Sequence, residues 1–346
     1  MIVKDAKDIA RQWVNEEASK TPGFCGAFYH GSVNWLADDA VLPAASDLDI
    51  MVVLARSELP DKPGKLLYRG LLLEVSYISS DQLRSAEAVL GQYEMAGSFR
   101  GRSIILDPSR QLANIQAIVS RDYAKRRWVY SRCEQARDKV LSYLQGLDSA
   151  APFHDQVASW LFATGVGTHV LLVAGLKNPT VRRRYVAVRE LLADYGRPDF
   201  HTALLEMLGC AGMTQERAEQ HLVALAEAFD AAKAVIKTPF PFASDISDIA
   251  RPIAIDGSRE LIKNGYHREA VFWLLATYSR CQKVFHEDGP AAMRDSFAPG
   301  YRRLLTDLGI ASVADLHRRG EQLKTQLPRI WQEAEAIMAA NPAIED

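Results

Sequence analysis

Hydrophobic and polar positions divide the chain into a mixed N-terminal part and a long helical remainder. Residues 4–19 place Ile9, Trp13 and Val14 on one side of a helix, and the pattern ends at Thr21-Pro22-Gly23. Runs with the composition of β-strands follow at 24–30, 48–54 and 66–78, with a weaker one at 103–106. The first hundred residues therefore predict a compact unit built from a helix and a small sheet.

From about residue 107 the strand pattern disappears and helical spacing replaces it. Asn178-Pro179 predicts a helix start, as N-cap and first-turn proline, and Gly196-Arg197-Pro198 follows the end of a helix. The predicted helices span 109–146, 154–175, 180–195, 199–209, 214–237, 257–286 and 321–339. We therefore expect an α+β fold, with a small mixed-sheet domain at 1–107 and a larger all-helical domain at 108–346.

Three acidic residues interrupt the predicted strands. Asp47 and Asp49 lie two positions apart at the start of the second run, so a strand would point both carboxylates to one face. Glu74 stands alone in the apolar run 71–78 and can supply a third carboxylate to that face. Like charges on a hydrophobic strand are usually balanced by a hard cation bound through oxygen, so these residues predict a magnesium site. Each acid has a simpler alternative as a strand-end, turn or solvent-facing residue.

Length and composition limit the classes of protein that fit. The 346 residues, 48% of them apolar, suggest about two domains with real cores. A formal charge of −2 gives no general attraction to nucleic acid or membrane. The N-terminus lacks a basic segment followed by an apolar one, and no uninterrupted run of 18 apolar residues occurs, so we expect a soluble cytoplasmic protein. The four cysteines (Cys25, Cys133, Cys210 and Cys281) are widely spaced, which disfavours a zinc site.

A glycine-serine pair precedes the acidic residues. Gly31 allows the backbone to approach a triphosphate closely, and Ser32 adds an N–H and a hydroxyl donor. This order of motifs resembles the nucleotidyltransferase superfamily that includes DNA polymerase β: first Gly31-Ser32, then Asp47 and Asp49, and then a strand bearing Glu74. Within that superfamily the chain is most similar to the antibiotic nucleotidyltransferases of the kanamycin type, chiefly over residues 24–85.

The resemblance implies a chemistry and a set of roles. A nucleoside monophosphate would pass from a nucleoside triphosphate to a hydroxyl of a small molecule, with Mg²⁺, expected as two ions, held by the three carboxylates. A general base on a helix after the sheet domain is also implied, and Glu134 and Asp138, one helical turn apart, are the two candidates. Lys177 and Arg184 are candidates for contacting the phosphates. Solvated positions on a helix surface are the alternative reading for both pairs.

The acceptor is less well defined. Trp35, Asp38 and Asp39 lie in the loop 33–45, between the glycine-serine turn and the acidic strand, where aromatic and acidic side chains suit an amino-sugar such as an aminoglycoside. Nucleotidyl transfer to RNA or protein, as in toxin-like minimal nucleotidyltransferases, is the alternative activity. A non-catalytic nucleotide-binding protein is the alternative class. The sequence does not specify the nucleobase, the acceptor or the oligomeric state, and a homodimer stays open.

Overall fold

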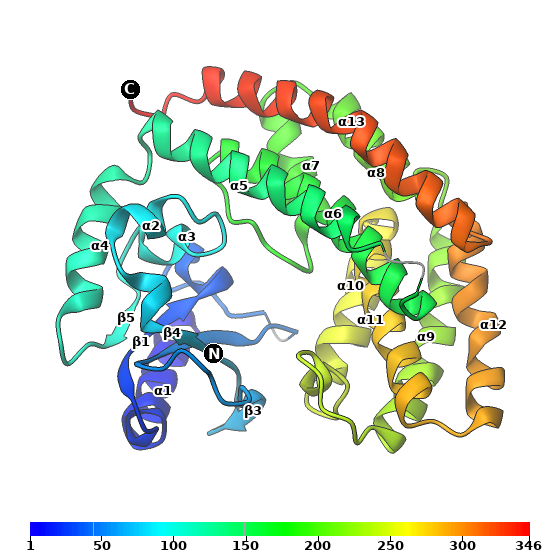
Figure 1. Cartoon of the computed structure of the whole chain (residues 1–346), viewed down its shortest axis with the longest axis horizontal. Helices are drawn as coiled ribbons and strands as arrows, with labels where there is room; N and C mark the ends of the chain where they lie inside the picture. The colour runs from blue at the N-terminus through cyan, green and yellow to red at the C-terminus, as the bar shows by residue number, and fades with distance from the viewer. Residues whose placement is uncertain (44, 148–149) are drawn as a thin grey trace. The chain divides into compact units, whose positions relative to one another are not determined.

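The computed structural model describes residues 1–43, 45–147 and 150–346, and their contacts form two compact units (Figure 1). The N-terminal unit comprises Met1–Gln135 together with Pro342–Asp346, and the helical unit comprises Ala136–Asn341. The first contains one five-stranded sheet and the second is built from helices, so the chain is a mixed α+β protein. By these contacts, helix α4 and the start of α5 group with the sheet, whereas the sequence suggests a boundary after residue 107.

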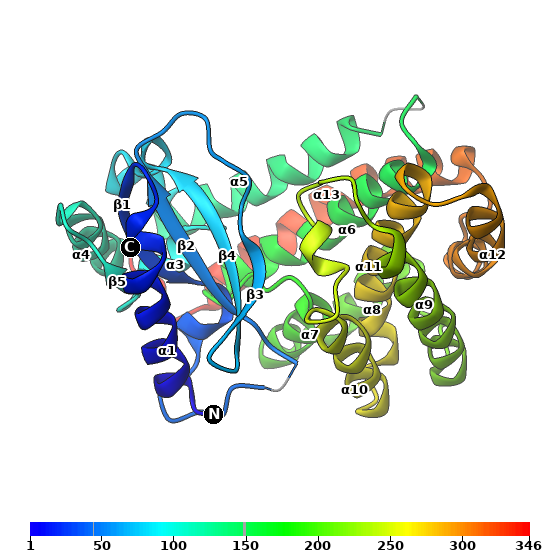
Figure 2. The same ribbon diagram turned by 90° about the horizontal axis from the view of Figure 1, so that it is seen from below.

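The N-terminal unit alternates helices and strands around its sheet. Its elements are α1 (Val3–Glu16), η1 (Ala18–Lys20), β1 (Phe24–His30), η2 (Gly31–Trp35), β2 (Leu48–Leu54), β3 (Gly64–Tyr68), β4 (Leu71–Ser79), η3 (Ser80–Leu83), α2 (Ala86–Leu90), α3 (Ala96–Phe99), β5 (Ile104–Leu106), α4 (Gln111–Asp122) and the first half of α5 (Arg126–Gln145). The strand order is β3-β4-β2-β1-β5, and β1, β2, β4 and β3 lie side by side in Figure 2. Within this sheet, as far as the structure describes the chain, β2 and β4 form the one parallel pair and the other pairs are antiparallel.

Alternation along the strands gives the sheet two distinct faces. Leu48 and Ile50 of β2, with Leu73 and Val75 of β4, are buried against α1. The opposite face packs Val53 and neighbouring residues against α2 and α4. Asp49 lies between Leu48 and Ile50, and Glu74 lies between Leu73 and Val75. Both acids therefore belong to the second face, near the N-terminal end of β2.

The helical unit is organised around two helices that are buried over most of their surface, α6 (Phe153–Ala174) and α11 (His267–Glu287). The other elements are α7 (Arg184–Asp194), α8 (Pro198–Leu208), α9 (Gln215–Val235), η4 (Ala243–Asp245), η5 (Pro252–Asp256), α10 (Gly257–Lys263), α12 (Ala291–Asp307) and α13 (Val313–Ala340). Helix α6 packs against α7, α8, α11 and α13, and it runs beside α13 in Figures 1 and 2.

Among the described residues, α6 is also the one helix long and apolar enough to cross a membrane. Most of its apolar surface is buried by the other helices of its unit, which is the environment of a core helix in a soluble protein.

The structure corrects several predicted element boundaries. The helix start at Asn178-Pro179 is wrong: the Thr180 amide donates to the Asn178 carbonyl (2.7 Å) in a loop, and α7 begins at Arg184. The predicted helix 109–146 is divided into α4 and α5, and 257–286 is divided at Gly265, whose φ of +83° ends α10. The strand 66–78 is a hairpin, β3 and β4, and α12 was not predicted.

Candidate active site

Two neighbouring strands bring the three predicted carboxylates together. In the parallel pair β2–β4, Asp49 lies beside Glu74, and Asp47 precedes Asp49 by two residues on the same face. Among the described residues, this is the one group of three metal-ligating side chains whose ligand atoms all lie within 4.8 Å of one another. Glu74 thus shares a sheet face with Asp47, while its neighbours Leu73 and Val75 are buried.

The turn after β1 fits closely against this cluster. His30, the last residue of β1, pairs with Asp49 across the sheet, and Gly31 follows with a φ of +63°. A β-carbon at position 31 would lie 3.1 Å from the carboxyl carbon of Asp49 and closer still to its Oδ2 oxygen. Glycine is therefore the one residue that can adopt this left-handed backbone conformation and also leave room for the Asp49 side chain. The turn continues through η2, where the Asn34 side-chain amide donates to the Tyr29 carbonyl (2.7 Å).

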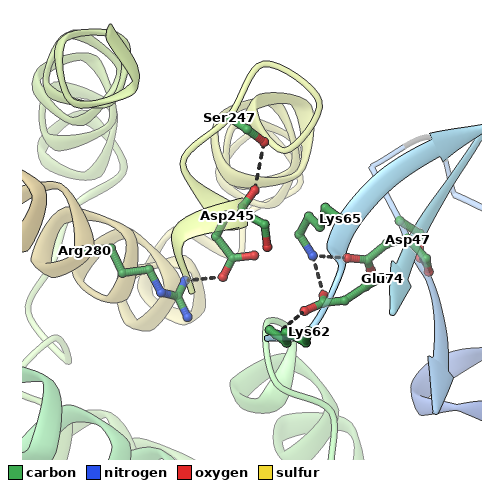
Figure 3. A network of polar contacts seen from close by, with 9 residues as sticks. Asp47, Lys62, Lys65, Glu74, Asp245, Ser247 and Arg280 are labelled. Atoms are coloured by element: carbon green, nitrogen blue, oxygen red, sulfur yellow. Dashed lines mark hydrogen bonds and ion pairs between the residues drawn. The ribbon is translucent and has the colours of Figure 1, made fainter. Parts of the chain in front are cut away.

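Two lysines that the sequence analysis did not identify contact the same carboxylates (Figure 3). The Lys65 ammonium donates to Asp47 Oδ2 and to Glu74 Oε2, and its side chain is only 5% exposed. The Lys62 ammonium lies 3.4 Å from Glu74 Oε1. Lys65 is opposite Glu74 in the β3–β4 hairpin. A correct register for this hairpin would therefore predict the contact between Lys65 and Glu74 from the sequence.

Burial and the negative charge of the cluster shift the pKa of Asp49. Burial, followed by the negative charges of Asp47 and Glu74, raises the pKa of the Asp49 carboxyl well above its usual range, against the opposing effect of Lys65 and Lys62. Three acids this close favour a positive charge among them. The oxygen-only donor set and its spacing fit a hard divalent cation such as Mg²⁺, which binds few carboxylates and keeps waters and phosphate oxygens in its shell.

His30 and Trp35 flank the turn. Burial lowers the pKa of His30, and its Nδ1 forms a hydrogen bond with the Ser98 hydroxyl (2.7 Å), so this side chain supports the turn. Trp35 is half-buried beside α3, near Gly97, with the Arg100 guanidinium 3.9 Å from its ring centroid. One face of the Trp35 ring is therefore covered by the Arg100 guanidinium.

The acidic residues of the loop 33–45, of which residue 44 is outside the described residues, lie beside α1. Asp38 pairs with Lys7 (2.8 Å), and its carbonyl accepts a hydrogen bond from the Lys4 amide. This ion pair lowers the pKa of the Asp38 carboxyl. Asp39 is exposed. The loop therefore covers the first turn of α1, and its acids are largely in solvent.

The remaining candidates lie on or after α5. Glu134 is partly buried and belongs to the N-terminal unit, while Asp138 is exposed, belongs to the helical unit and pairs with Arg137 (3.2 Å). Lys177 is exposed in the loop before α7. Arg184 is only 1% exposed, and its guanidinium lies 4.1 Å from the ring centroid of Phe272. Arg184 is thus part of the core of the helical unit.

No protein-family model matches this chain, and no match was found among curated proteins.

Proposed function

We propose that this protein is a magnesium-dependent nucleotidyltransferase that transfers a nucleoside monophosphate from a nucleoside triphosphate to a hydroxyl of a small molecule. The observation that carries the proposal is the cluster of Asp47, Asp49 and Glu74 on one sheet face, directly against the left-handed turn at Gly31. Acids alone are common on proteins. A glycine turn fitted against the acids supports a site where phosphate and metal meet.

The order of elements supports the same proposal. A small mixed sheet followed by helices is the arrangement that the nucleotidyltransferase resemblance implies, with the sheet as catalytic domain and the helices as an accessory, substrate-binding domain. Four free cysteines, three of them buried, are consistent with the proposed cytoplasmic location.

Each residue of the cluster has a definite role in this proposal. Asp47, Asp49 and Glu74 would hold the metal, and Gly31 and Ser32 would present backbone and hydroxyl donors to the triphosphate. When bound, Mg²⁺ would neutralise charge on the transferring phosphoryl group and favour loss of pyrophosphate. The residues of the chain would otherwise act by holding the reacting groups in line, since phosphoryl transfer needs placement more than covalent chemistry.

The acceptor site and the general base complete the proposal. Asp38 would have to exchange Lys7 for a cationic acceptor, so Trp35 and Asp39 are better suited to bind an amino-sugar. Glu134 and Asp138 both stay as candidates for the base. Of the two phosphate-contact candidates, Lys177 is retained because it is exposed, whereas the guanidinium of Arg184 is buried against Phe272.

A labelling experiment tests the proposal. The protein is incubated with Mg²⁺, each of the four α-³²P nucleoside triphosphates and, in separate reactions, aminoglycosides, neutral sugars, RNA or the protein alone. We expect a labelled small molecule and released pyrophosphate, lost with Asp49→Asn and kept with Asp61→Asn, the same change at a neighbouring exposed position. Label found only on RNA or protein would replace the small-molecule acceptor with a macromolecular one. Equal turnover in Asp49→Asn would reject the site.

A further inference from the structure

The carboxylate cluster already contains a positive charge supplied by the chain itself. The Lys65 ammonium bridges Asp47 and Glu74 by donating to one oxygen of each (Figure 3). Its position is set by the β3–β4 hairpin, which places Lys65 directly opposite Glu74. Asp47 and Glu74 are 21% and 23% exposed and Lys65 is 5% exposed, so water screens this contact only weakly.

The same oxygens cannot serve the ammonium and a divalent cation together. A Mg²⁺ ligand oxygen lies about 2.0–2.1 Å from the ion. An ammonium donates to a carboxylate over about 2.7–2.9 Å. A metal bound to Asp47 Oδ2 and Glu74 Oε2 would therefore be almost in contact with the nitrogen that bridges them, and two cations at that separation repel strongly in a partly buried site.

The position of Lys65 allows it to leave. Strand β3 is at the edge of the sheet, and the ammonium is carried by a flexible four-carbon chain, so it can rotate away without disturbing the strand pairing. The Lys62 ammonium lies 3.4 Å from Glu74 Oε1, and its side chain is 28% exposed, compared with 5% for Lys65. Lys62 holds the cluster less tightly.

We propose that Lys65 is an internal counter-cation that a divalent metal ion must displace in order to bind to Asp47 and Glu74. Lys65 thereby weakens the binding of metal and sets the concentration at which the site is loaded. The proposal rests on the proposed function, because it takes this cluster as the metal site. It adds Lys65 as a residue that regulates the loading of that site with metal.

Metal affinity is the first test. Binding of Mn²⁺ alone is measured by calorimetry for the wild type, Lys65→Met and Lys62→Met, with Lys20→Met as an exposed control for loss of one positive charge. We expect the Kd to fall about tenfold or more in Lys65→Met, about twofold to threefold in Lys62→Met, and not at all in Lys20→Met. Lys65→Gln provides a polar neutral variant if the methionine variant does not fold.

The outcomes separate this inference from the proposed function. An unchanged or weaker affinity in Lys65→Met and Lys65→Gln, with metal bound by the wild type, overturns the inference and leaves the metal site intact. Absence of Mn²⁺ binding in the wild type and all variants rejects the metal site and the inference with it.

A second test uses the unaltered protein. Lysine acylation is followed by mass spectrometry with and without saturating Mn²⁺, since a displaced Lys65 becomes accessible to the reagent. We expect labelling of Lys65 to rise at least about threefold with metal while Lys20 stays constant. Labelling of Lys65 that does not change when metal is bound overturns the inference without affecting the metal site.

Discussion

Replacing Gly31 by alanine tests the closest approach in the site. Gly31 has a φ of +63°, and a β-carbon there would lie 3.1 Å from the carboxyl carbon of Asp49 and nearer to Oδ2. The new methyl group therefore meets two separate obstacles. One is the left-handed backbone, and the other is the side chain of Asp49, which cannot retreat freely because it is partly buried on β2.

The two obstacles can be given separate magnitudes. An alanine in the left-handed region costs about 1–2 kcal/mol. Moving Asp49 out of its rotamer costs about 0.5–1.5 kcal/mol more. We therefore expect Gly31→Ala to lower the free energy of unfolding by about 1.5–3.5 kcal/mol. Turnover should fall by about 100-fold, because a displacement of about 1 Å in a catalytic group has that effect.

Gly70 provides a matched control. Its φ is +80°, but a β-carbon there meets nothing within 4 Å, so Gly70→Ala carries the backbone cost alone. Urea unfolding followed by circular dichroism should show a loss of about 1–2 kcal/mol for Gly70→Ala, with turnover unchanged. In an Asp49→Ala background, the additional cost of Gly31→Ala should disappear, which makes the pair a double-mutant cycle.

Equal destabilisation by Gly31→Ala and Gly70→Ala would refute the reasoning. It would mean that the contact between the turn and Asp49 imposes no constraint, and the argument for a built phosphate turn would lose its main support. The same conclusion would follow if Gly31→Ala cost as much in the Asp49→Ala background as in the wild type.

Three further predictions concern single residues in each unit. Asp49→Asn should abolish Mg²⁺-dependent turnover while the melting temperature stays equal or rises, because a buried like-charge repulsion is removed; a marked loss of stability would contradict this. Burial lowers the pKa of His154 from 6.5 to about 4, so the unfolded chain binds more protons between these values and stability is lost as pH falls from 6.5 towards 4. We expect about 2 kcal/mol less stability at pH 5 than at pH 7, and this slope should flatten in His154→Gln; an equal slope in both proteins would exclude His154 as its source. Arg184→Met should lower stability by about 1–3 kcal/mol without changing the KM for nucleotide, and a raised KM with unchanged stability would return Arg184 to the phosphate site.

The strands that carry the acids could be predicted from the sequence because their faces differ. The predicted runs 24–30 and 48–54 coincide with β1 and β2, and alternation placed Asp49 and Glu74 on the face opposite their buried neighbours. The hairpin β3–β4 was merged into one strand. Its two-residue turn, Arg69-Gly70, has positive φ at both positions, and arginine is not a residue that announces such a turn.

The position of the Arg69-Gly70 turn also determines whether the sequence predicts a contact between Lys65 and Glu74. This contact depends on the cross-strand register, which follows only once the turn is located. The same applies to the helices. The loop around Asn178 offers helix-start residues, but the chain delays α7 until Arg184, whose side chain is buried against Phe272, and such tertiary packing overrides a local capping signal.

The return of residues 342–346 to the N-terminal unit affects the order in which the protein can be completed during synthesis. Glu345 accepts a hydrogen bond from the Arg126 amide (2.7 Å) and donates to the Ala124 carbonyl (3.0 Å), which closes a loop containing the whole helical unit. The sheet can form as soon as its strands leave the ribosome, but the isolated bridge between residues 124–126 and Glu345, which lies outside the sheet, must wait until more than 200 further residues have been translated. Until then the Arg126 amide and the Ala124 carbonyl lack the partners that Glu345 provides.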